Sequence, residues 1–222
     1  MKSHALVAAA VIAAAQAAAV PAPDYRPIAD LVRPADADWP MVRRTYDGWG
    51  YSPLDQITPQ NVARLQPAWV FSTGVTNGHE APPIVHDGVM FVATPGNQVI
   101  ALDAKTGGLL WRYKRPIAED IVLLHGTSRG VALFGDKVFF AAAEAVLVAL
   151  DAKTGKEVWT ATVEDNRNGY YMSVAPLVAA GKVMVGASGG ELGIRGFVAA
   201  YDVNDQTPAR RVPVTDRDCV GV

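Results

Sequence analysis

The stretch Ala101-Leu-Asp-Ala-Lys-Thr-Gly-Gly-Leu-Leu-Trp111 is repeated with few changes as Ala149-Leu-Asp-Ala-Lys-Thr-Gly-Lys-Glu-Val-Trp159. The two copies begin 48 residues apart, and valine-rich stretches flank both of them. A repeat of this length indicates one supersecondary unit that is used several times. Four short strands per repeat unit is typical of a β-propeller, in which each blade is a four-stranded sheet. The repeat therefore predicts an all-β fold, a partial β-propeller of about three four-stranded blades.

Each residue type in the repeat has a structural reason to be there. The Asp103 carboxylate is expected to accept hydrogen bonds from backbone N–H groups of the turn, and Thr106 to add a weaker one. Gly107 supplies the positive φ that the turn needs. Trp111 starts the next strand and packs between blades, where a large flat ring buries much area. The aspartates and tryptophans of both copies are therefore assigned to architecture and not to catalysis.

Short β-rich runs separated by turn residues predict the strands of these blades. A single short helix is expected at 58–65, because Thr58 is a suitable cap and Pro59 suits the first helical position. Another strand is expected to start in 65–71, around Trp69. The remaining eleven expected strands are 84–85, 89–93, 99–102, 110–113, 130–134, 137–141, 146–150, 158–163, 175–178, 182–186 and 197–201.

A third copy of the repeat begins at the expected spacing and then departs from the motif. Val198-Ala-Ala-Tyr-Asp202 matches its start, but Arg210 stands where the tryptophan should be, and Pro208 is expected to interrupt the strand. The rest of the chain has no repeat character. The pattern predicts that residues 203–222 are an aberrant tail, from a frameshifted or truncated reading frame.

The N-terminus reads as a targeting segment. Residues 1–19 combine a weakly positive start, an apolar run and small-residue cleavage sites, which is typical of a secretory signal peptide. The run is too short for a membrane-spanning helix, so no stable membrane anchor is expected. An extended leader is expected over 20–45, followed by propeller over 46–202. The sequence thus predicts an exported, periplasmic protein.

Composition excludes several classes of protein. The chain has 222 residues, 50% of them hydrophobic, with a net charge of −2, which are ordinary globular values. No basic excess points to nucleic acid. The single cysteine, Cys219, rules out an intrachain disulfide, and no Cys-x-x-Cys-His motif for an attached haem is present.

From Trp49 to Asp202 the chain resembles the pyrroloquinoline quinone (PQQ)-dependent alcohol dehydrogenases, the quinoproteins related to methanol dehydrogenase. Trp49-Gly-Tyr-Ser-Pro-Leu-Asp-Gln-Ile57 is similar to the opening segment of that family, and the repeats are similar to its tryptophan-docking motifs. The resemblance implies an eight-bladed propeller with PQQ and a metal ion, calcium or a lanthanide, on its axis.

The resemblance also assigns roles to residues between the repeats. Glu80, in His79-Glu-Ala-Pro-Pro83, corresponds to a glutamate that hydrogen-bonds to PQQ; taken alone it reads as a surface glutamate in a loop. Arg129 corresponds to an arginine that pairs with a PQQ carboxylate, which suits its fork of donors. A solvated arginine at a strand start is the plainer alternative.

A glycine-rich stretch, Gly186-Ala-Ser-Gly-Gly-Glu-Leu-Gly193, is the most specific of these matches. By resemblance Glu191 is a metal ligand, since hard cations prefer carboxylate oxygen. Ser188, Gly189 and Gly190 are expected to contact PQQ carboxylates, and so is Ser173. Glycines let backbone N–H groups approach an anion. Without the resemblance, a glycine-rich hairpin with one exposed glutamate would look the same.

The sequence departs from the family at Leu123-Leu124-His125, where methanol dehydrogenase has an adjacent cysteine pair that covers one face of PQQ. Leu124 or His125 is expected to cover that face instead. The tryptophan under PQQ, the asparagine that completes the metal site and the catalytic aspartate are all expected downstream, so no catalytic residue is assigned here. In the family a small alcohol gives hydride to PQQ, and electrons pass to a c-type cytochrome. The chain alone is predicted to be inactive.

The competing interpretation is a non-enzymatic propeller. Some periplasmic propellers share this repeat and act as scaffolds in outer-membrane protein assembly without PQQ. Such a protein is expected to lack the residues that would cradle PQQ, and usually to carry a lipidation cysteine near its N-terminus. Glu80, Arg129, Ser188 and Glu191 in their motifs, and the absence of that cysteine, favour the dehydrogenase.

Overall fold

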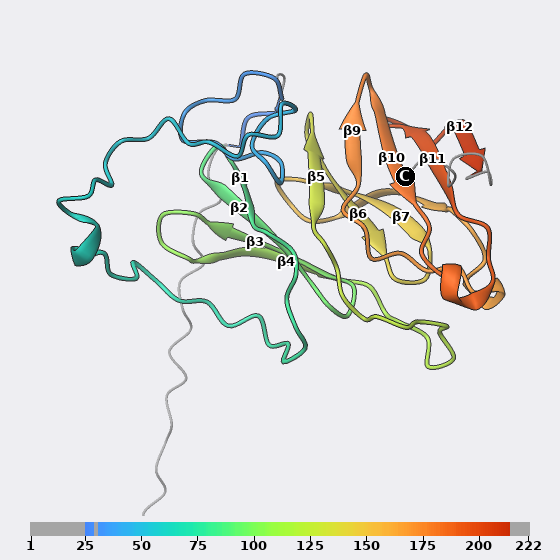
Figure 1. Cartoon of the computed structure of the whole chain (residues 1–222). Coiled ribbons are helices and arrows are strands. Elements are labelled where there is room, and N and C mark those ends of the chain that lie inside the picture. The colour runs from blue at the N-terminus through green and yellow to red at the C-terminus, as the bar shows by residue number, and fades with distance from the viewer. Residues whose placement is uncertain (1–24, 29–30, 214–222) are drawn as a thin grey trace, which may run out of the picture.

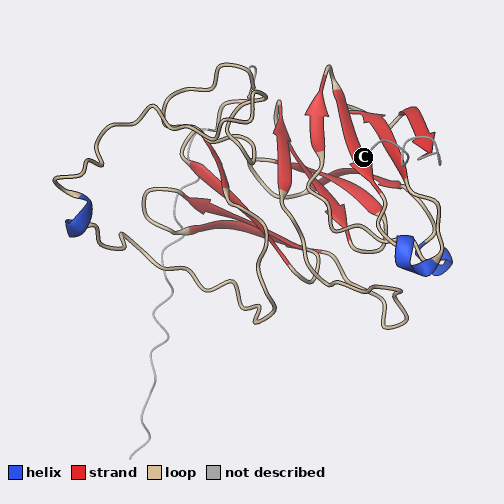
Figure 2. Ribbon diagram, viewed as in Figure 1, coloured by secondary structure: helices blue, strands red, loops and turns tan. Residues whose placement is uncertain are grey.

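The computed structural model describes residues 25–28 and 31–213. It contains three four-stranded antiparallel sheets, called blades 1 to 3, and only three short 3-10 helices, η1 (Val62–Arg64), η2 (Asn166–Asn168) and η3 (Gly190–Leu192) (Figure 2). Within each blade the strands pair in sequence order. The all-β, partial propeller prediction is confirmed. The predicted signal peptide lies outside the described residues, as does the end of the predicted tail.

The three blades stand side by side along the chain (Figure 1). The first strand of the second blade contacts both its neighbours, through β2 and β9. Blade 1 consists of β1 (Ile84–His86), β2 (Val89–Thr94), β3 (Gln98–Asp103) and β4 (Leu109–Lys114); blade 2 of β5 (Val131–Phe134), β6 (Lys137–Ala142), β7 (Val146–Asp151) and β8 (Glu157–Thr162); blade 3 of β9 (Leu177–Ala179), β10 (Lys182–Gly186), β11 (Phe197–Asp202) and β12 (Pro208–Pro213). All eleven strands predicted from 84 onward are present, with ends that differ by at most two residues.

The apolar faces of the sheets form two cores, one on each side of blade 2. Phe91, Val138 and Phe140 belong to the core between blades 1 and 2. Phe139 and Leu147 point to the opposite face of blade 2 and belong to the core that reaches blade 3. Blade 2 is buried on both faces because successive residues of a strand alternate between them. Its strands are accordingly almost continuously apolar.

The repeated motif joins one blade to the next. The Trp111 indole N–H donates to the carbonyl oxygen of Ala152 at 2.9 Å, and its ring covers Gly155, where a Cβ would lie 2.5 Å from a ring carbon. Trp69 repeats this contact on the turn of blade 1, with a 3.2 Å hydrogen bond to Ala104 and its ring over Gly107. The assignment of these residues to architecture agrees with this packing.

The expected strand at 65–71 is not formed. Trp69 docks in the position that the tryptophan of a fourth strand takes in the other blades. However, no described strand pairs with residues 65–71. Without a neighbouring ladder the backbone has no partner groups with which to form a sheet. The segment 50–66, which includes η1, instead loops out from the sheets (Figure 1), and large apolar side chains such as Trp49 and Val70 are exposed.

The expected helix at 58–65 is also wrong in extent and in its cap. Only η1 forms, and Asn61 is its N-cap residue rather than Thr58. The Asn61 side chain accepts a hydrogen bond from the Thr58 N–H at 2.8 Å and donates to the Gln56 carbonyl. These local bonds satisfy the backbone in a turn, which competes with a longer helix.

The expectation that Pro208 interrupts the last strand is wrong as well. Strand β12 begins at Pro208 and pairs with β11 over its whole length. The first residue of an edge strand is a position that proline tolerates. Arg210 faces Ala200 across the ladder, just as Trp111 faces Ala101 in blade 1, so Arg210 does occupy the tryptophan position.

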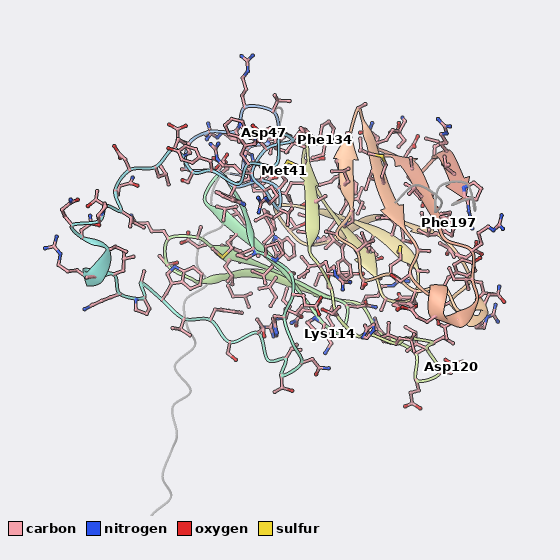
Figure 3. All side chains as sticks on the ribbon, viewed as in Figure 1. Met41, Asp47, Lys114, Asp120, Phe134 and Phe197 are labelled. Atoms are coloured by element: carbon pink, nitrogen blue, oxygen red, sulfur yellow. The ribbon has the colours of Figure 1, made fainter. Side chains whose placement is uncertain are left out.

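The segment that the sequence predicts as a leader lies against blades 1 and 2 where it is described. Tyr25, Ile28 and Leu31 are buried in the core between these blades. Ile28 forms an isolated antiparallel bridge with Gly135, and Trp39 forms one with Val85. Met41, from the same segment, lines a cavity together with Leu133 of β5, and Figure 3 labels Met41 in this region. No helix in the described ranges is long and apolar enough to cross a membrane.

Candidate cofactor and metal site

Three of the predicted site residues lie just before the first strands of successive blades. Glu80 precedes β1 by four residues, Arg129 precedes β5 by two, and Ser173 precedes β9 by four. The first strands of neighbouring blades start at the same end of the molecule, so these three positions converge there. A loop after β10 carries Ser188, Gly189, Gly190 and Glu191 to the same place.

These residues surround an open cavity of about 770 Å³, which is within the range of small-molecule sites. Its lining residues come from the loop before β5, the segment before β9 and the loop after β10: His125, Arg129, Tyr171, Ser173, Ser188, Gly189, Gly190 and Glu191. Glu80 joins the group through its ion pair with Arg129. The structure therefore brings together all seven residues that the sequence predicts for the site.

Arg129 is held in place by blade 3. Its backbone N–H donates to the carbonyl oxygen of Ser173 at 2.9 Å, and its Nη1 donates to the Ser173 hydroxyl at 2.5 Å. Its Nη2 lies 3.3 Å from a carboxylate oxygen of Glu80, and about half of each of these two side chains is exposed. Such an exposed pair contributes only about 0–1 kcal/mol. The guanidinium can therefore exchange Glu80 for an incoming carboxylate at little cost.

The glycine loop has a backbone that only glycine allows at one point. Gly189 has a φ of 121°, and a Cβ there would lie 2.1 Å from the carbonyl oxygen of Gly169. Any side chain at this position would collide with the backbone. At Gly190, by contrast, a Cβ would meet nothing within 4 Å. Folding alone explains Gly189, whereas the space beside Gly190 is open to a ligand.

Glu191 is exposed and lies in η3, at the edge of the cavity. Across the described ranges, no cluster of three or more histidine, cysteine, aspartate or glutamate side chains is placed to hold a metal ion. Glu191 is thus a single carboxylate ligand in this part of the site. A hard cation takes six or more oxygen ligands, so it would need further donors from cofactor, water or protein.

Tyr171 is a cavity residue that the motif comparison does not select. Its side chain is buried, and its backbone exchanges two hydrogen bonds with Ser188, at 3.2 and 2.8 Å. Burial raises the pKa of its phenol, the Glu191 carboxylate raises it further, and Arg129 opposes the rise. The sequence signal that could have identified Tyr171 is alternation along an extended segment, because residues two apart, such as Tyr171 and Ser173, point to the same side.

The segment at the position of the missing cysteine pair contributes one residue. His125 lines the cavity, whereas Leu124 is not among the lining residues and is 49% exposed. Of the two side chains expected to cover a face of the cofactor, His125 is the one that reaches the cavity.

The chemistry of the donor set fits PQQ, which is a planar tricarboxylate. A guanidinium, the hydroxyls of Ser173 and Ser188 and the open approach to Gly190 are all suited to carboxylate oxygens. Glu191 supplies the type of oxygen that a calcium or lanthanide ion prefers. The residues present therefore match both an anionic cofactor and an accompanying cation.

Comparison with known proteins identifies the family of the chain. The family model described as "PQQ: Glucose/ethanol/alcohol dehydrogenase, beta-propeller domain" matches residues 39–207. Quinohemoprotein alcohol dehydrogenase ADH IIB from Pseudomonas putida is 42% identical over 173 residues, which is 77% of this chain and 25% of that protein. The lanthanide-dependent methanol dehydrogenase of Methylacidiphilum fumariolicum is also 42% identical, over 75% of this chain and 28% of its own length.

Solved structures match in the same way. A europium-containing methanol dehydrogenase superimposes with a TM-score of 0.77 and 37% identity, covering 83% of this chain and 33% of that one. The quinohemoprotein alcohol dehydrogenase from Comamonas testosteroni has a TM-score of 0.75 and 37% identity, over 79% and 27% of the two chains. The chain spans about a quarter of the length of the curated relatives it matches. With its blades, its docked tryptophans and its matched family model, the chain belongs to the PQQ-dependent glucose/ethanol/alcohol dehydrogenase β-propeller family.

Proposed function

We propose that this chain is the N-terminal part of an exported PQQ-dependent alcohol dehydrogenase, and that it carries one side of the cofactor site. The observation that carries the proposal is the convergence of Glu80, Arg129, Ser173 and the loop 188–191 on one cavity. In such an enzyme PQQ supplies a quinone that accepts hydride from the alcohol.

In this proposal the residues of the chain bind the cofactor and orient it. The fork of Arg129 pairs with one carboxylate of the cofactor, while the Ser173 hydroxyl keeps the guanidinium in position. Ser188, Gly189 and Gly190 donate hydrogen bonds to other cofactor oxygens. Glu80 also turns to the cofactor, and Glu191 binds the metal, calcium or a lanthanide.

The remaining parts of the proposal follow from the relatives and from the N-terminal sequence. The substrate is a small alcohol, the electron acceptor is a c-type cytochrome, and the location is the periplasm. Residues 1–19 act as a signal peptide, 20–45 as a leader and 46–202 as propeller; the segment 203–222, expected to be a tail, adds β12 to blade 3 up to Pro213. The 222-residue chain by itself is expected to bind the cofactor without turning over alcohol, since its assigned residues include no catalytic base.

Equilibrium titration of PQQ with calcium or lanthanum onto the chain tests the proposal. Arg129→Ala should weaken binding at least tenfold, because it removes a charge-assisted, two-pronged contact. Arg129→Lys should recover only part of the loss, since an ammonium lacks the fork geometry. Arg112→Ala is the matched control, because this exposed arginine lies in β4 away from the cavity. Equal binding by all variants would refute the proposal and favour the scaffold interpretation.

Dye reduction with PQQ, calcium and a small alcohol tests the expectation that the chain alone does not turn over alcohol. No turnover is expected from the chain alone. Robust turnover would contradict the assignment of the catalytic base to a region beyond these residues.

A further inference from the structure

Tyr171 is a large side chain of the cavity that has no role in the proposed function so far. Only 2% of the residue is exposed, yet it lines the cavity together with Arg129 and Glu191. Its backbone is joined by two hydrogen bonds to Ser188, in the loop that carries Glu191. These bonds fix the backbone of Tyr171 beside the loop that carries Glu191.

The hydroxyl of Tyr171 makes no hydrogen bond within the described part of the chain. Two other tyrosines do: the Tyr113 hydroxyl donates to Glu157 at 2.6 Å, and that of Tyr46 donates to the Val178 carbonyl. A buried tyrosine normally finds a partner for its hydroxyl. The cavity in front of Tyr171 is where such a partner would bind.

The charges around the phenol define that partner. Tyr171 interacts electrostatically with Glu191 and with Arg129, which have opposite charges. A tyrosine phenol is a neutral hydrogen-bond donor. Arg129, Tyr171 and Glu191 line the same cavity, so a ligand that binds the guanidinium and a cation on Glu191 comes within reach of this donor, and the matching group on the ligand is an oxygen acceptor.

We infer that Tyr171 is a further cofactor-binding residue, whose hydroxyl donates a hydrogen bond to an anionic oxygen of the quinone cofactor between Arg129 and Glu191. The inference rests on the proposed function. It adds to that function a donor that fixes the cofactor from the side of blade 3, independently of Arg129.

Binding of PQQ by Tyr171→Phe is the first test, because phenylalanine keeps the ring and removes only the donor. Its dissociation constant should rise about tenfold, the loss expected for a hydrogen bond to a charged acceptor. Tyr201→Phe is the matched control: Tyr201 is also buried, but it belongs to the core between blades 2 and 3 and does not line the cavity. Its dissociation constant should not change.

The outcomes separate this inference from the proposed function. If Arg129→Ala weakens binding and Tyr171→Phe does not, the inference is overturned and the proposed function stands. If PQQ binds equally to the wild-type chain and to Arg129→Ala, both are overturned. If both variants weaken binding and Tyr201→Phe does not, the inference is supported.

A second readout tests where the hydroxyl points. In chain labelled with 3-fluorotyrosine, the fluorine NMR signal of Tyr171 is assigned by its loss in Tyr171→Phe. That signal should move on addition of PQQ, and also in Glu191→Gln without any ligand, while the signal of Tyr201 stays in place. A Tyr171 signal that is unchanged by saturating PQQ would contradict the inference.

Discussion

The turns that follow β3 and β7 differ from the turn that follows β11, although all three close the same kind of hairpin. In the first two, Asp103 and Asp151 each accept hydrogen bonds from the N–H and the hydroxyl of a threonine three residues later, at 2.6–2.8 Å. In the third, Asp202 accepts from Asn204 instead and pairs with Lys182 at 2.7 Å. The ladder is nevertheless built alike, with one register shift at the same position in all three.

The docking of tryptophan shows what the altered turn loses. Trp111 bonds to Ala152 at 2.9 Å, whereas Trp159 bonds to Val203 at 3.4 Å. Gly155, at φ 70°, lies under the Trp111 ring, but the equivalent residue in blade 3 is Gln206, at φ 61°. Strand pairing therefore needs only backbone groups, whereas close contact between blades depends on the side chains of the motif.

Among the variants that test this difference between turns, Gly155→Ala is expected to change the free energy of unfolding most. A new Cβ would lie 2.5 Å from the Trp111 ring at a left-handed backbone position, so the tryptophan must move. The free energy of unfolding should fall by about 3 kcal/mol, from overpacking and backbone strain together. Urea denaturation followed by fluorescence measures it.

Gly96→Ala is the control for that measurement. Gly96 has a similar φ of 80°, but a Cβ there meets nothing within 4 Å. It should cost only the backbone strain, about 1 kcal/mol. Equal losses in the two variants would show that the tryptophan contact contributes nothing.

A smaller effect of opposite sign is expected in blade 3 from Gln206→Gly. Gln206 is held in the left-handed region, which glycine adopts without strain. Relief of that strain exceeds the entropy that glycine adds to the unfolded chain, so stability should rise by about 0.5–1 kcal/mol. A destabilised variant in thermal or urea unfolding would indicate that the Gln206 side chain makes a compensating contact.

The smallest expected difference between the two kinds of turn is in what lowers the pKa of their aspartates. The hydrogen bond from the Thr106 hydroxyl, with backbone N–H bonds, lowers the pKa of Asp103; the Lys182 ammonium is the main cause that lowers the pKa of Asp202. Because both pKa values are lowered on folding, their stabilisation is complete above the unfolded value near ~3.9 and is lost as pH falls through the folded value.

Salt should separate the two carboxyl groups. In about 1 M NaCl the pKa of Asp202 should return toward its ordinary value, because its cause is an exposed charge pair, and that of Asp103 should hardly change. NMR titration of both side chains measures this. Thr106→Val and Lys182→Gln are the matched variants, and a salt response at Asp103 as large as at Asp202 would contradict the assigned causes.

Local patterns were sufficient to predict eleven strands and the docking of Trp111, because hairpin turns and the alternation of apolar residues act over a few residues. They failed where a distant partner decides the outcome. Residues 65–71 have the composition of a strand but no neighbouring strand, and β12 forms despite Pro208 because β11 offers a ladder. Tyr25 and Ile28 lie in a core that their own surroundings in sequence do not indicate.

The seven predicted site residues came from motif resemblance, and their convergence on one cavity is a property of the tertiary structure. Sequence by itself determined the repeat, the blade count within this chain and the chemical types of the donors, since these depend on residue identity and short-range order. Only the packing of blades brought Arg129 against Ser173 and placed Tyr171 on the same cavity as Arg129 and Glu191. The physical reason is that these contacts join segments more than forty residues apart, or segments on either side of the β9–β10 hairpin, and a local pattern carries no information on which of them meet.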